Sequence, residues 1–346
     1  MLILLNCFDE ASMGKYKVVV LSPVPEALIK MWATPVAQRY GISPEDIDVV
    51  TIFEPNYEEV ARQVADADVV VGDYTFRIKI DASLCEKMSK VRLIQQPSTG
   101  YDHIDVEACA KRGIPVANIG GANAVSVAEH TVMLALMLLK RAVYAHSKLV
   151  GGQWTQGELM NIIGEIYGKT WGVLGMGRIG REVAIRVLAF GAKVIYYDVV
   201  RKEDVEKLGV EYRPFNRLLA ESDILSIHVP LTPETRGMIG EKELRMMKPT
   251  AILINVSRGE ITDEEALARA VREGWIAGVG VDVFSVEPPP ADHPLLQVAK
   301  EGFNVVVTPH IGGATSEARM RIINVTLENV VRALAGLRPE NVVNMP

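Results

Sequence analysis

Short runs of apolar residues alternate with longer segments in which apolar positions recur every three or four residues. In the first half of the chain, the runs that predict strands lie at 16–22, 48–53, 68–71, 93–96 and 115–117. In the second half, they lie at 170–174, 193–198, 224–228, 251–255, 276–281 and 304–307. Strands that alternate with amphipathic helices are typical of a parallel sheet covered by helices on both faces. We therefore expect an α/β fold with such a sheet in each half.

The segment 126–148 predicts one long helix between the two halves. Ser126 and Glu129 have the Ser-x-x-Glu spacing of a capping box, which favours a helix start at this point. Apolar residues occur on all sides of the middle of this segment. We therefore expect the helix to be buried between domains or between subunits.

Length and charge limit the classes of function. A chain of 346 residues corresponds to about two domains at ~150 residues each. The 37 Lys and Arg residues are outnumbered by 43 Asp and Glu residues, and the net charge of −6 argues against binding to nucleic acid or to an anionic membrane. No apolar stretch reaches the ~20 residues of a membrane helix, and the N-terminus lacks the basic region of a signal peptide.

The cysteines and the N-terminus add two expectations. Cys7, Cys85 and Cys109 are too few and too scattered for a disulfide framework or a zinc site, so we expect a cytoplasmic protein with no bound metal. The tripeptide Met-Gly-Lys at 13–15 directly precedes the first predicted strand and fits a second start codon. In that case residues 1–12 form an N-terminal extension.

A glycine-rich turn carries the clearest local signal. The segment 175–180 reads Gly-Met-Gly-Arg-Ile-Gly and lies between a predicted strand and a segment of helical spacing. In a dinucleotide-binding turn, Gly175 would bend the chain, Gly177 would let the backbone approach a pyrophosphate, and Gly180 would let helix and strand pack closely. The start of the helix would offer N–H groups to the phosphates. The alternative is a glycine turn in an α/β protein that binds no nucleotide.

An acidic residue follows this turn at the spacing of a ribose-binding carboxylate. Asp198 lies 18 residues after Gly180, at the end of the next predicted strand, and about 20 residues are typical of such a carboxylate. A carboxylate there binds the ribose hydroxyls of NAD and repels the 2′-phosphate of NADP, so NAD is favoured over NADP. Arg201 and Lys202 follow closely and argue against this preference.

Polar residues come just after the last three predicted strands. They are Arg258, Asp282 and His310, and in a parallel sheet all three lie at the same edge as the glycine turn. Each has a structural alternative: a surface arginine, a turn cap and a loop histidine. Glu287 precedes a run of three prolines, and His293, the other histidine nearby, fits a structural role in a turn.

Three of these residues fit the reduction of a ketone by a hydride. The ketone oxygen gains charge as the hydride arrives, and a histidine such as His310 has a suitable pKa to donate a proton there. A carboxylate such as Glu287 orients the imidazole and raises its pKa. The planar guanidinium of Arg258 can bind the carboxylate of a substrate through two hydrogen bonds.

Taken together, the motifs resemble the D-isomer-specific 2-hydroxyacid dehydrogenases. The resemblance covers nearly the whole chain from about residue 16 onwards. It is carried by Asp198 and Glu287 and by the segments 175–180, 228–232, 255–259, 280–284 and 308–313. It implies that His310 is the general acid in reduction and the base in the reverse reaction. Glu287 would be the partner of this histidine, and Arg258 would bind the substrate's carboxylate and carbonyl.

The resemblance also implies contacts to NAD and to the substrate. Asp282 would hold the nicotinamide carboxamide, and the backbone N–H groups of Arg178 and Ile179 would bind the pyrophosphate. The full set of implied cofactor contacts is Gly175, Gly177, Arg178, Ile179, Gly180, Asp198, His228, Pro230, Val256, Ser257, Arg258, Asp282, His310, Gly312 and Gly313. The backbone amides of Thr99 and Gly100 would hold the substrate's carboxylate. Phe76 would lie in a second substrate loop.

In this family one domain is inserted into the other. The resemblance implies a Rossmann NAD-binding domain at 126–313, inserted into a flavodoxin-like catalytic domain formed by 13–125 and 314–346. Both would be doubly wound parallel sheets, with a hinged cleft that closes and excludes water before hydride transfer. The helix 126–148 would connect the domains and pack at the interface of a homodimer.

The substrate loop, 73–79, favours a small, unphosphorylated 2-oxo acid such as glyoxylate or hydroxypyruvate. Enzymes of this family that act on 3-phosphoglycerate tend to carry Arg and Ser where Thr75 and Phe76 stand. Many of them also have a further regulatory domain, whereas the sequence here ends at Pro346. Formate enzymes carry Gln at the place of Glu287, which argues against formate.

Three alternatives stay open. D-3-phosphoglycerate is the alternative substrate, because Arg77 and Lys79 could reach a phosphate. A non-catalytic NAD(H)-sensing corepressor would bind the same cofactor but would not need Arg258, Glu287 and His310 together. A hydrolase of the S-adenosylhomocysteine type with bound NAD resembles only the cofactor half of the chain.

Overall fold

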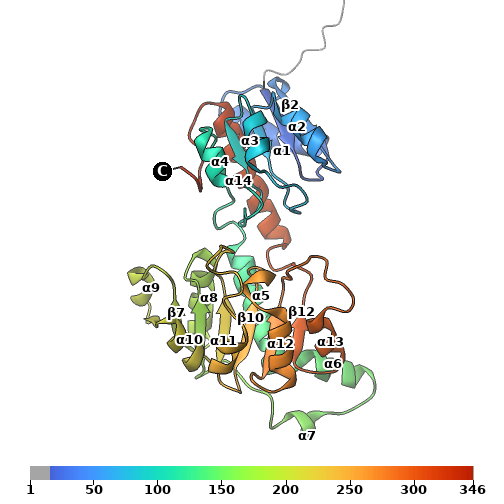
Figure 1. The fold of residues 1–346 in the computed structure, drawn as a ribbon, viewed down its shortest axis with the longest axis vertical. Helices are drawn as coiled ribbons and strands as arrows, with labels where there is room; N and C mark the ends of the chain where they lie inside the picture. Colours follow the sequence, from blue (N-terminus) through green and yellow to red (C-terminus); the bar gives the residue numbers. More distant parts are fainter. Residues whose placement is uncertain (1–15, 346) are drawn as a thin grey trace, which may run out of the picture. The chain divides into compact units, whose positions relative to one another are not determined.

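The computed structural model describes residues 16–345, which form two compact units (Figure 1). Of the described residues, the first unit combines 16–122 with 319–345, and the second unit comprises Asn123–Ala318. Each unit has its own sheet and its own hydrophobic clusters. The extension expected at 1–12 lies outside the described residues.

The first unit contains a parallel sheet with the strand order β2-β1-β3-β4-β5. Its strands are β1 (Tyr16–Val20), β2 (Ile47–Thr51), β3 (Val69–Val71), β4 (Leu93–Gln95) and β5 (Val116–Ala117). Its helices are α1 (Glu26–Arg39), η1 (Pro44–Asp46), α2 (Tyr57–Val64), α3 (Ala82–Lys87), α4 (Val106–Lys111) and most of α14 (Ser316–Leu334). Because successive strand residues face opposite sides, Val18 shares a cluster with α1 and α14, whereas Val19 shares one with α2, α3 and α4. This order is that of flavodoxin-like folds, as expected.

The second unit contains a parallel sheet with the strand order β12-β11-β10-β9-β6-β7-β8. Its strands are β6 (Thr170–Leu174), β7 (Lys193–Tyr197), β8 (Glu211–Tyr212), β9 (Ile224–Ile227), β10 (Ile252–Asn255), β11 (Gly278–Val281) and β12 (Val305–Val307). On one face pack α5 (Ala124–Leu139) and α8 (Arg178–Ala189). On the other face pack α10 (Phe215–Glu221), α11 (Glu241–Met246), α12 (Glu264–Arg272) and α13 (Pro294–Lys300). The order reverses at β6, as in the Rossmann fold that we expected.

The helix predicted at 126–148 is in fact two helices, and its capping box does not form. α5 begins at Ala124 and ends at Leu139, and α6 (Ala142–Val150) starts after Arg141, whose φ is 52°. Ser126 lies inside α5, where its buried hydroxyl donates to the carbonyl of Gly312 at 2.6 Å. The predicted capping box was wrong because the Ser126 hydroxyl bonds a distant loop and not its own helix start.

Short elements account for the other differences. The sequence pattern did not indicate β8, α7 (Gln156–Leu159) or α13, and it did not separate the turn η2 (Gly259–Ile261) from its surroundings. The short helix α9 (Glu203–Glu206) lies within the segment 203–208, whose spacing predicts a helix. β8 has two residues, too few to show an alternation. α13 begins with Pro294, a residue that breaks helices but is well tolerated at the first helical position. Among residues 16–345, no helix combines the length and the apolar character that crossing a membrane requires.

Candidate active site

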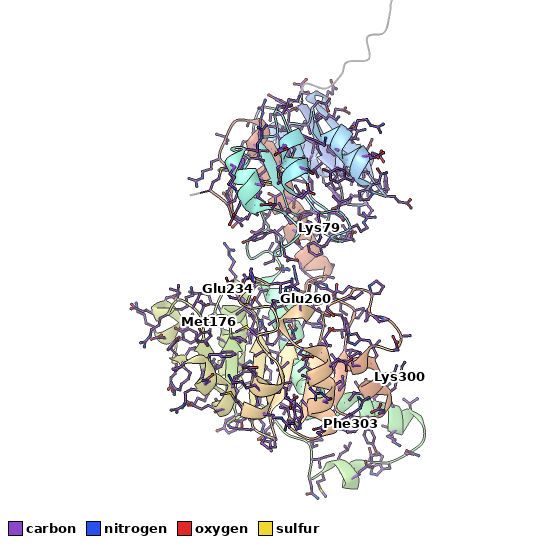
Figure 2. All side chains as sticks on the ribbon, in the orientation of Figure 1. Lys79, Met176, Glu234, Glu260, Lys300 and Phe303 are labelled. Carbon is purple, nitrogen blue, oxygen red and sulfur yellow. The ribbon has the colours of Figure 1, made fainter. Side chains whose placement is uncertain are left out.

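The glycine turn joins β6 to α8 at the point where the sheet order reverses (Figure 2, Met176). Gly175 has a φ of 96°, and a Cβ atom at this position would lie 2.8 Å from the backbone of His228. A Cβ at Gly180 would lie 2.2 Å from the carbonyl oxygen of Gly175. Gly177 is the N-cap of α8, and a Cβ there would meet no described atom within 4 Å. Two glycines are thus required by packing, while the third leaves room at a helix N-terminus, which fits a pyrophosphate.

Asp198 is fixed to this turn. It follows β7, and its Oδ2 accepts a hydrogen bond from the Met176 N–H at 2.9 Å. Lys202 Nζ is 3.8 Å from Oδ1. Arg201, however, donates to Glu206 from Nε at 2.7 Å and from Nη2 at 2.9 Å, so its guanidinium is already bound elsewhere. The carboxylate therefore fits ribose hydroxyls, and one of the two cations that argued for NADP is engaged.

His228 and its neighbours follow β9 beside the glycine turn. Both ring nitrogens of His228 are buried and have no hydrogen-bond partner within residues 16–345. Burial lowers the pKa of this imidazole to about 3, so it is neutral at pH 7. Pro230 is exposed, and the carbonyl of Val229 accepts a hydrogen bond from the Ser257 hydroxyl. A buried polar ring without a partner beside the turn is a place where a cofactor's polar group fits.

His310 and Glu287 form a close pair. His310 Nδ1 lies 2.6 Å from Glu287 Oε2, and each side chain is a little more than one-third exposed. The other oxygen, Oε1, accepts from the Phe284 N–H at 3.0 Å. Burial raises the pKa of the Glu287 carboxyl, but the hydrogen bonds from His310 and Phe284 and the nearby Arg258 charge lower it by more. The Glu287 carboxylate is therefore ionised at neutral pH. Because it binds Nδ1 of His310, the other ring nitrogen, Nε2, can face a substrate.

Arg258 lies on the loop after β10, together with Val256 and Ser257. Its Nη1 donates to the Ser257 carbonyl at 2.9 Å, and its own carbonyl accepts from Asn255 Nδ2 at 2.8 Å. A Cβ on the next residue, Gly259, would lie 2.1 Å from the backbone between Phe284 and Ser285. The loop of Arg258 thus packs directly against the loop that leads to Glu287.

Asp282 and the 308–313 loop complete this edge of the sheet. The Asp282 side chain is 2% exposed and accepts hydrogen bonds from the N–H groups of Ile311 and Gly312. Burial raises the pKa of its carboxyl, but the hydrogen bonds that it accepts lower it by more, so Asp282 is ionised. A Cβ at Gly313 would lie 2.8 Å from Asn123 Nδ2, which makes the close approach of the loop to the start of α5 depend on a glycine.

Three of the four residues expected to contact the substrate, Phe76, Thr99 and Gly100, lie on two adjoining loops of the first unit, and the fourth is Arg258. Phe76 has a φ of 55°, and its ring packs edge-on against His103 with 4.6 Å between centroids. Ile80 N–H, just beyond the first loop, donates to the His103 carbonyl at 2.9 Å. Each of the two units thus brings its own candidate residues together.

Arg77, which could reach a phosphate if D-3-phosphoglycerate were the substrate, donates most of its hydrogen bonds within or near its own loop. Its Nε donates to Asp73 Oδ2 at 3.0 Å and its Nη1 to the Phe53 carbonyl at 2.9 Å. The Asp73 side chain is fully buried and also accepts from the hydroxyl and the N–H of Thr75. Burial raises the pKa of the Asp73 carboxyl, but these hydrogen bonds lower it by more. Lys79 is exposed (Figure 2).

Sequence reasoning missed some of the residues that build the site. Asp73, His130 and Thr308 carry hydrogen bonds that shape the two loops. Asp73 could have been found from the Asp-x-Thr spacing of an Asx turn. His130 offered no such signal, because its partners lie more than 150 residues away.

Comparisons with known proteins agree with this geometry. Residues 132–312 match the model of the D-isomer specific 2-hydroxyacid dehydrogenase NAD-binding domain. A glyoxylate reductase of Korarchaeum cryptofilum is 44% identical over 84% of this chain and 86% of its own length. A D-3-phosphoglycerate dehydrogenase of Methanocaldococcus jannaschii is 39% identical over 95% of this chain but 60% of its own.

A solved structure extends the comparison to both units. D-lactate dehydrogenase from Aquifex aeolicus, complexed with NAD and lactic acid, matches with a TM-score of 0.80 and 32% identity. The match covers 95% of this chain and 99% of that one. The dinucleotide turn, the two sheet orders and the relatives lead to one conclusion: this chain belongs to the D-isomer-specific 2-hydroxyacid dehydrogenase family and is an NAD-dependent oxidoreductase.

Proposed function

We propose that this protein reduces a small, unphosphorylated 2-oxo acid, glyoxylate or hydroxypyruvate, with NADH. The observation that carries the proposal is the 2.6 Å contact between His310 Nδ1 and Glu287 Oε2, on loops that adjoin the loop of Arg258. A proton donor, an orienting carboxylate and a planar cation are the groups that reduction of a 2-oxo acid requires. The names of the relatives support glyoxylate as a substrate.

In this mechanism the protein binds, orients and protonates, and the bound NADH supplies the hydride. His310 Nε2 donates a proton to the carbonyl oxygen, while Glu287 holds Nδ1 and stabilises the positive charge of the ring before transfer. The guanidinium of Arg258 binds the substrate's carboxylate. In the reverse direction His310 accepts the hydroxyl proton, because the same contact serves both directions.

The second unit would hold the cofactor through the residues implied above. Gly175–Gly180 would bind the pyrophosphate, Asp198 the ribose, and Asp282 the nicotinamide carboxamide, with His228 as a neutral neighbour. The domain that we assign to NAD is 126–313, and the catalytic domain combines 13–125 with 314–346. Thr99 and Gly100 would bind the carboxylate from the catalytic domain, and closure would exclude water.

The preference for an unphosphorylated substrate rests on the 73–79 loop. A phosphate needs an available cation, but the guanidinium of Arg77 is bound by Asp73 and by the Phe53 carbonyl, which leaves the exposed Lys79 as the other cation of this loop. Phe76, in the middle of this loop, offers an apolar ring in place of a donor. D-3-phosphoglycerate is therefore the less favoured alternative, although a relative carries that name.

A substrate panel tests this proposal. NADH oxidation is followed by absorbance with glyoxylate, hydroxypyruvate, pyruvate and 3-phosphohydroxypyruvate. We expect turnover with the first two and a kcat/KM at least about tenfold lower with the phosphorylated acid, which lacks a charge-assisted partner. NADH binding without turnover on any acid would instead support the corepressor-like alternative. A preference for the phosphorylated acid would support the phosphoglycerate alternative.

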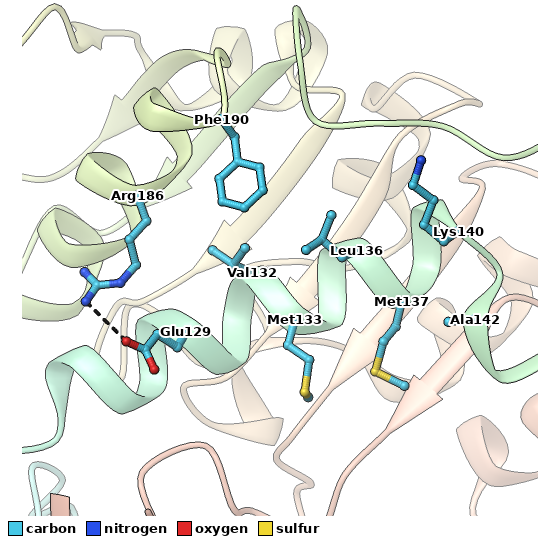
Figure 3. Close-up of a pocket in the computed structure, with 9 residues that line it drawn as sticks. All are labelled: Glu129, Val132, Met133, Leu136, Met137, Lys140, Ala142, Arg186 and Phe190. Carbon is cyan, nitrogen blue, oxygen red and sulfur yellow. Dashed lines mark ion pairs between the residues drawn. The ribbon is translucent and has the colours of Figure 1, made fainter. Parts of the chain in front are cut away.

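We also propose a homodimer through the 126–148 region. The groove in Figure 3 runs along α5 beside α8 and has exposed apolar side chains at Met133 and Phe190. An ion pair of 3.6 Å between Arg186 and Glu129 lies at one end. A second copy of the chain fits this apolar groove, because in an isologous dimer the same surface of each subunit contacts that of the other. Light scattering of the parent and of Met133→Lys tests this proposal. We expect the mass of a dimer for the parent and that of a monomer for the variant. The same mass for both proteins would contradict the proposal.

A cytoplasmic location is the remaining proposal. Cys85 and Cys109 are free and buried within the part of the chain that the structure describes. Free thiols fit a reducing compartment, where disulfides rarely persist. Cell fractionation with an antibody against the protein tests the location, and recovery outside the cytoplasm contradicts it.

A further inference from the structure

A buried aspartate joins the second unit's core to the loop that carries His310. The Oδ1 atom of Asp282 accepts from the Thr308 hydroxyl at 2.6 Å and from the Ile311 N–H at 2.9 Å. Its Oδ2 accepts from the Gly312 N–H at 2.7 Å. One carboxylate therefore holds the 308–313 loop in place, and a residue that fixes the position of this carboxylate also fixes the position of the loop.

His130, on α5, also contacts this carboxylate, at the oxygen that accepts from Thr308. Its Nε2 lies 2.9 Å from Thr308 Oγ1 and 3.3 Å from Asp282 Oδ1. The Thr308 hydroxyl already donates its only hydrogen to Asp282, so it can only accept from the imidazole. An ionised carboxylate also only accepts. Nε2 therefore carries a hydrogen, and the ring orientation is set by these two oxygens.

The backbone at His310 needs such support. Its φ of 52° lies in the left-handed region, which residues other than glycine seldom adopt. A conformation of this kind persists only when its surroundings over-determine it. The His310 N–H donates to the Asp282 carbonyl at 2.8 Å, and the next two N–H groups donate to the Asp282 carboxylate. From α5, the Ser126 hydroxyl adds a further bond to the Gly312 carbonyl at 2.6 Å.

We propose that His130 is a positioning residue for His310: it orients Thr308 and Asp282, which hold the His310 backbone and so aim its imidazole. The catalytic part of this inference rests on the proposed function. His130 acts through its two partners, so its loss changes the placement of the proton donor and not the identity of the chemistry. A misplacement of about 1 Å at a reacting group costs on the order of 10²-fold in rate.

The first test needs no activity. Hydrogen exchange of a peptide that contains Ile311 and Gly312 is compared in the parent, His130→Ala and His130→Gln, without cofactor. Loss of a hydrogen bond to a charged group predicts exchange on the order of tenfold faster in the alanine variant. Glutamine carries an N–H near the place of Nε2 and should restore most of the protection. Exchange in α12 serves as the internal reference, and equal loop exchange in parent and alanine variant overturns the proposal.

The second test is kinetic. We expect His130→Ala to lower kcat about 10- to 100-fold with KM for the 2-oxo acid within about twofold, because the donor is misplaced while Arg258 is intact. Thr308→Val should give a similar loss, and the double variant no further loss, because both act on one network. Thr34→Val is the control, since the hydroxyl of Thr34 donates only within its own helix.

Each outcome has a defined meaning. Faster loop exchange with lower kcat in the alanine and Thr308→Val variants, and recovery in His130→Gln, supports the positioning role. Unchanged kcat, additive losses in the double variant, or a glutamine variant no better than alanine overturns it. If the parent reduces no 2-oxo acid, the proposed function fails, and the exchange measurement alone decides whether His130 holds the loop.

Discussion

Two loops, one in each unit, share an unusual design. Each is built on a buried aspartate, and each carries a residue other than glycine with positive φ. In the first unit Asp73 supports the loop of Phe76, whose φ is 55°, and in the second unit Asp282 supports the loop of His310, whose φ is 52°. Both carboxyls have a pKa below the usual range, because their hydrogen bonds outweigh the effect of burial.

The two loops differ in where the aspartate finds its partners. The side chain of Asp73 is bound by Thr75 and Arg77, which lie within four residues of it. Asp282 is bound by a loop that starts 26 residues later and by His130 on another helix. A loop held by its own neighbours can change without disturbing the core, whereas a loop held by distant elements keeps a fixed geometry. Under the proposed function, we therefore assign substrate selection to the first loop and proton transfer to the second.

The largest expected effect tests the difference between the two loops directly. His310→Ala should lower kcat by on the order of 10²–10⁴-fold, the loss expected when a general acid is removed. Phe76→Ala, at the matching position of the other loop, should change kcat less than tenfold and act mainly on KM. NADH binding, followed by fluorescence, is the control for folding of both variants. A kcat loss in Phe76→Ala as large as that in His310→Ala would remove the distinction.

The next effect compares two arginines. Arg258→Lys should lower kcat/KM about 10- to 100-fold, because a planar fork that binds a carboxylate is lost. Arg77→Lys should leave kcat/KM for glyoxylate within a few-fold, because Arg77 binds its own loop. Steady-state kinetics with glyoxylate checks both variants. Similar losses in the two would show that Arg77 also contacts the substrate.

A third change releases the first loop. Asp73→Asn removes the charge that binds Arg77, so the guanidinium can turn to a phosphate. We expect kcat/KM for 3-phosphohydroxypyruvate to rise about tenfold relative to glyoxylate, the gain of one charge-assisted hydrogen bond. Asp81→Asn is the matched control, because Asp81 caps α3 through its side chain and asparagine caps a helix equally well. An unchanged ratio would contradict the role of Asp73 in selection.

The smallest effect concerns acid stability of the two units. The pKa of His228 falls from 6.5 to about 3 on folding, so between these values only the unfolded chain binds the proton. The stability of the second unit is therefore full above pH 6.5 and decreases as the pH falls toward 3. Asp73 acts in the same sense, but only below about pH 3.8, because its pKa is lowered from that value.

Urea unfolding at pH 7 and pH 5 measures this difference. The His228→Asn variant should lose less stability between the two pH values than the parent, because asparagine does not titrate. His146→Asn is the control, since His146 is exposed. Equal pH dependence in the parent and the His228 variant would show that this histidine is not buried in its neutral form.

The sequence predicted the two sheets and the residues at their edges, because buried strands and glycine turns leave local patterns. It did not predict the break of the long helix at Arg141, where the chain adopts a left-handed conformation that no local pattern marks. The prediction that Ser126 caps a helix was wrong, because the sequence alone does not distinguish a hydroxyl that bonds a distant carbonyl, here Gly312, from one that bonds its own helix start. His130 stayed unnoticed for the same reason: its role depends on partners that only the folded chain brings near.

The division of the chain into two units has a consequence for how such enzymes diversify. His310, Glu287 and Arg258 all belong to Asn123–Ala318, whereas the 73–79 loop belongs to the other unit. Under the proposed function, mutations that change which acid is accepted can therefore accumulate in the first unit while the reacting groups of the second unit stay unchanged. A new metabolite can then become a substrate through the substitution of a few loop residues, with no change in the residues that transfer the proton.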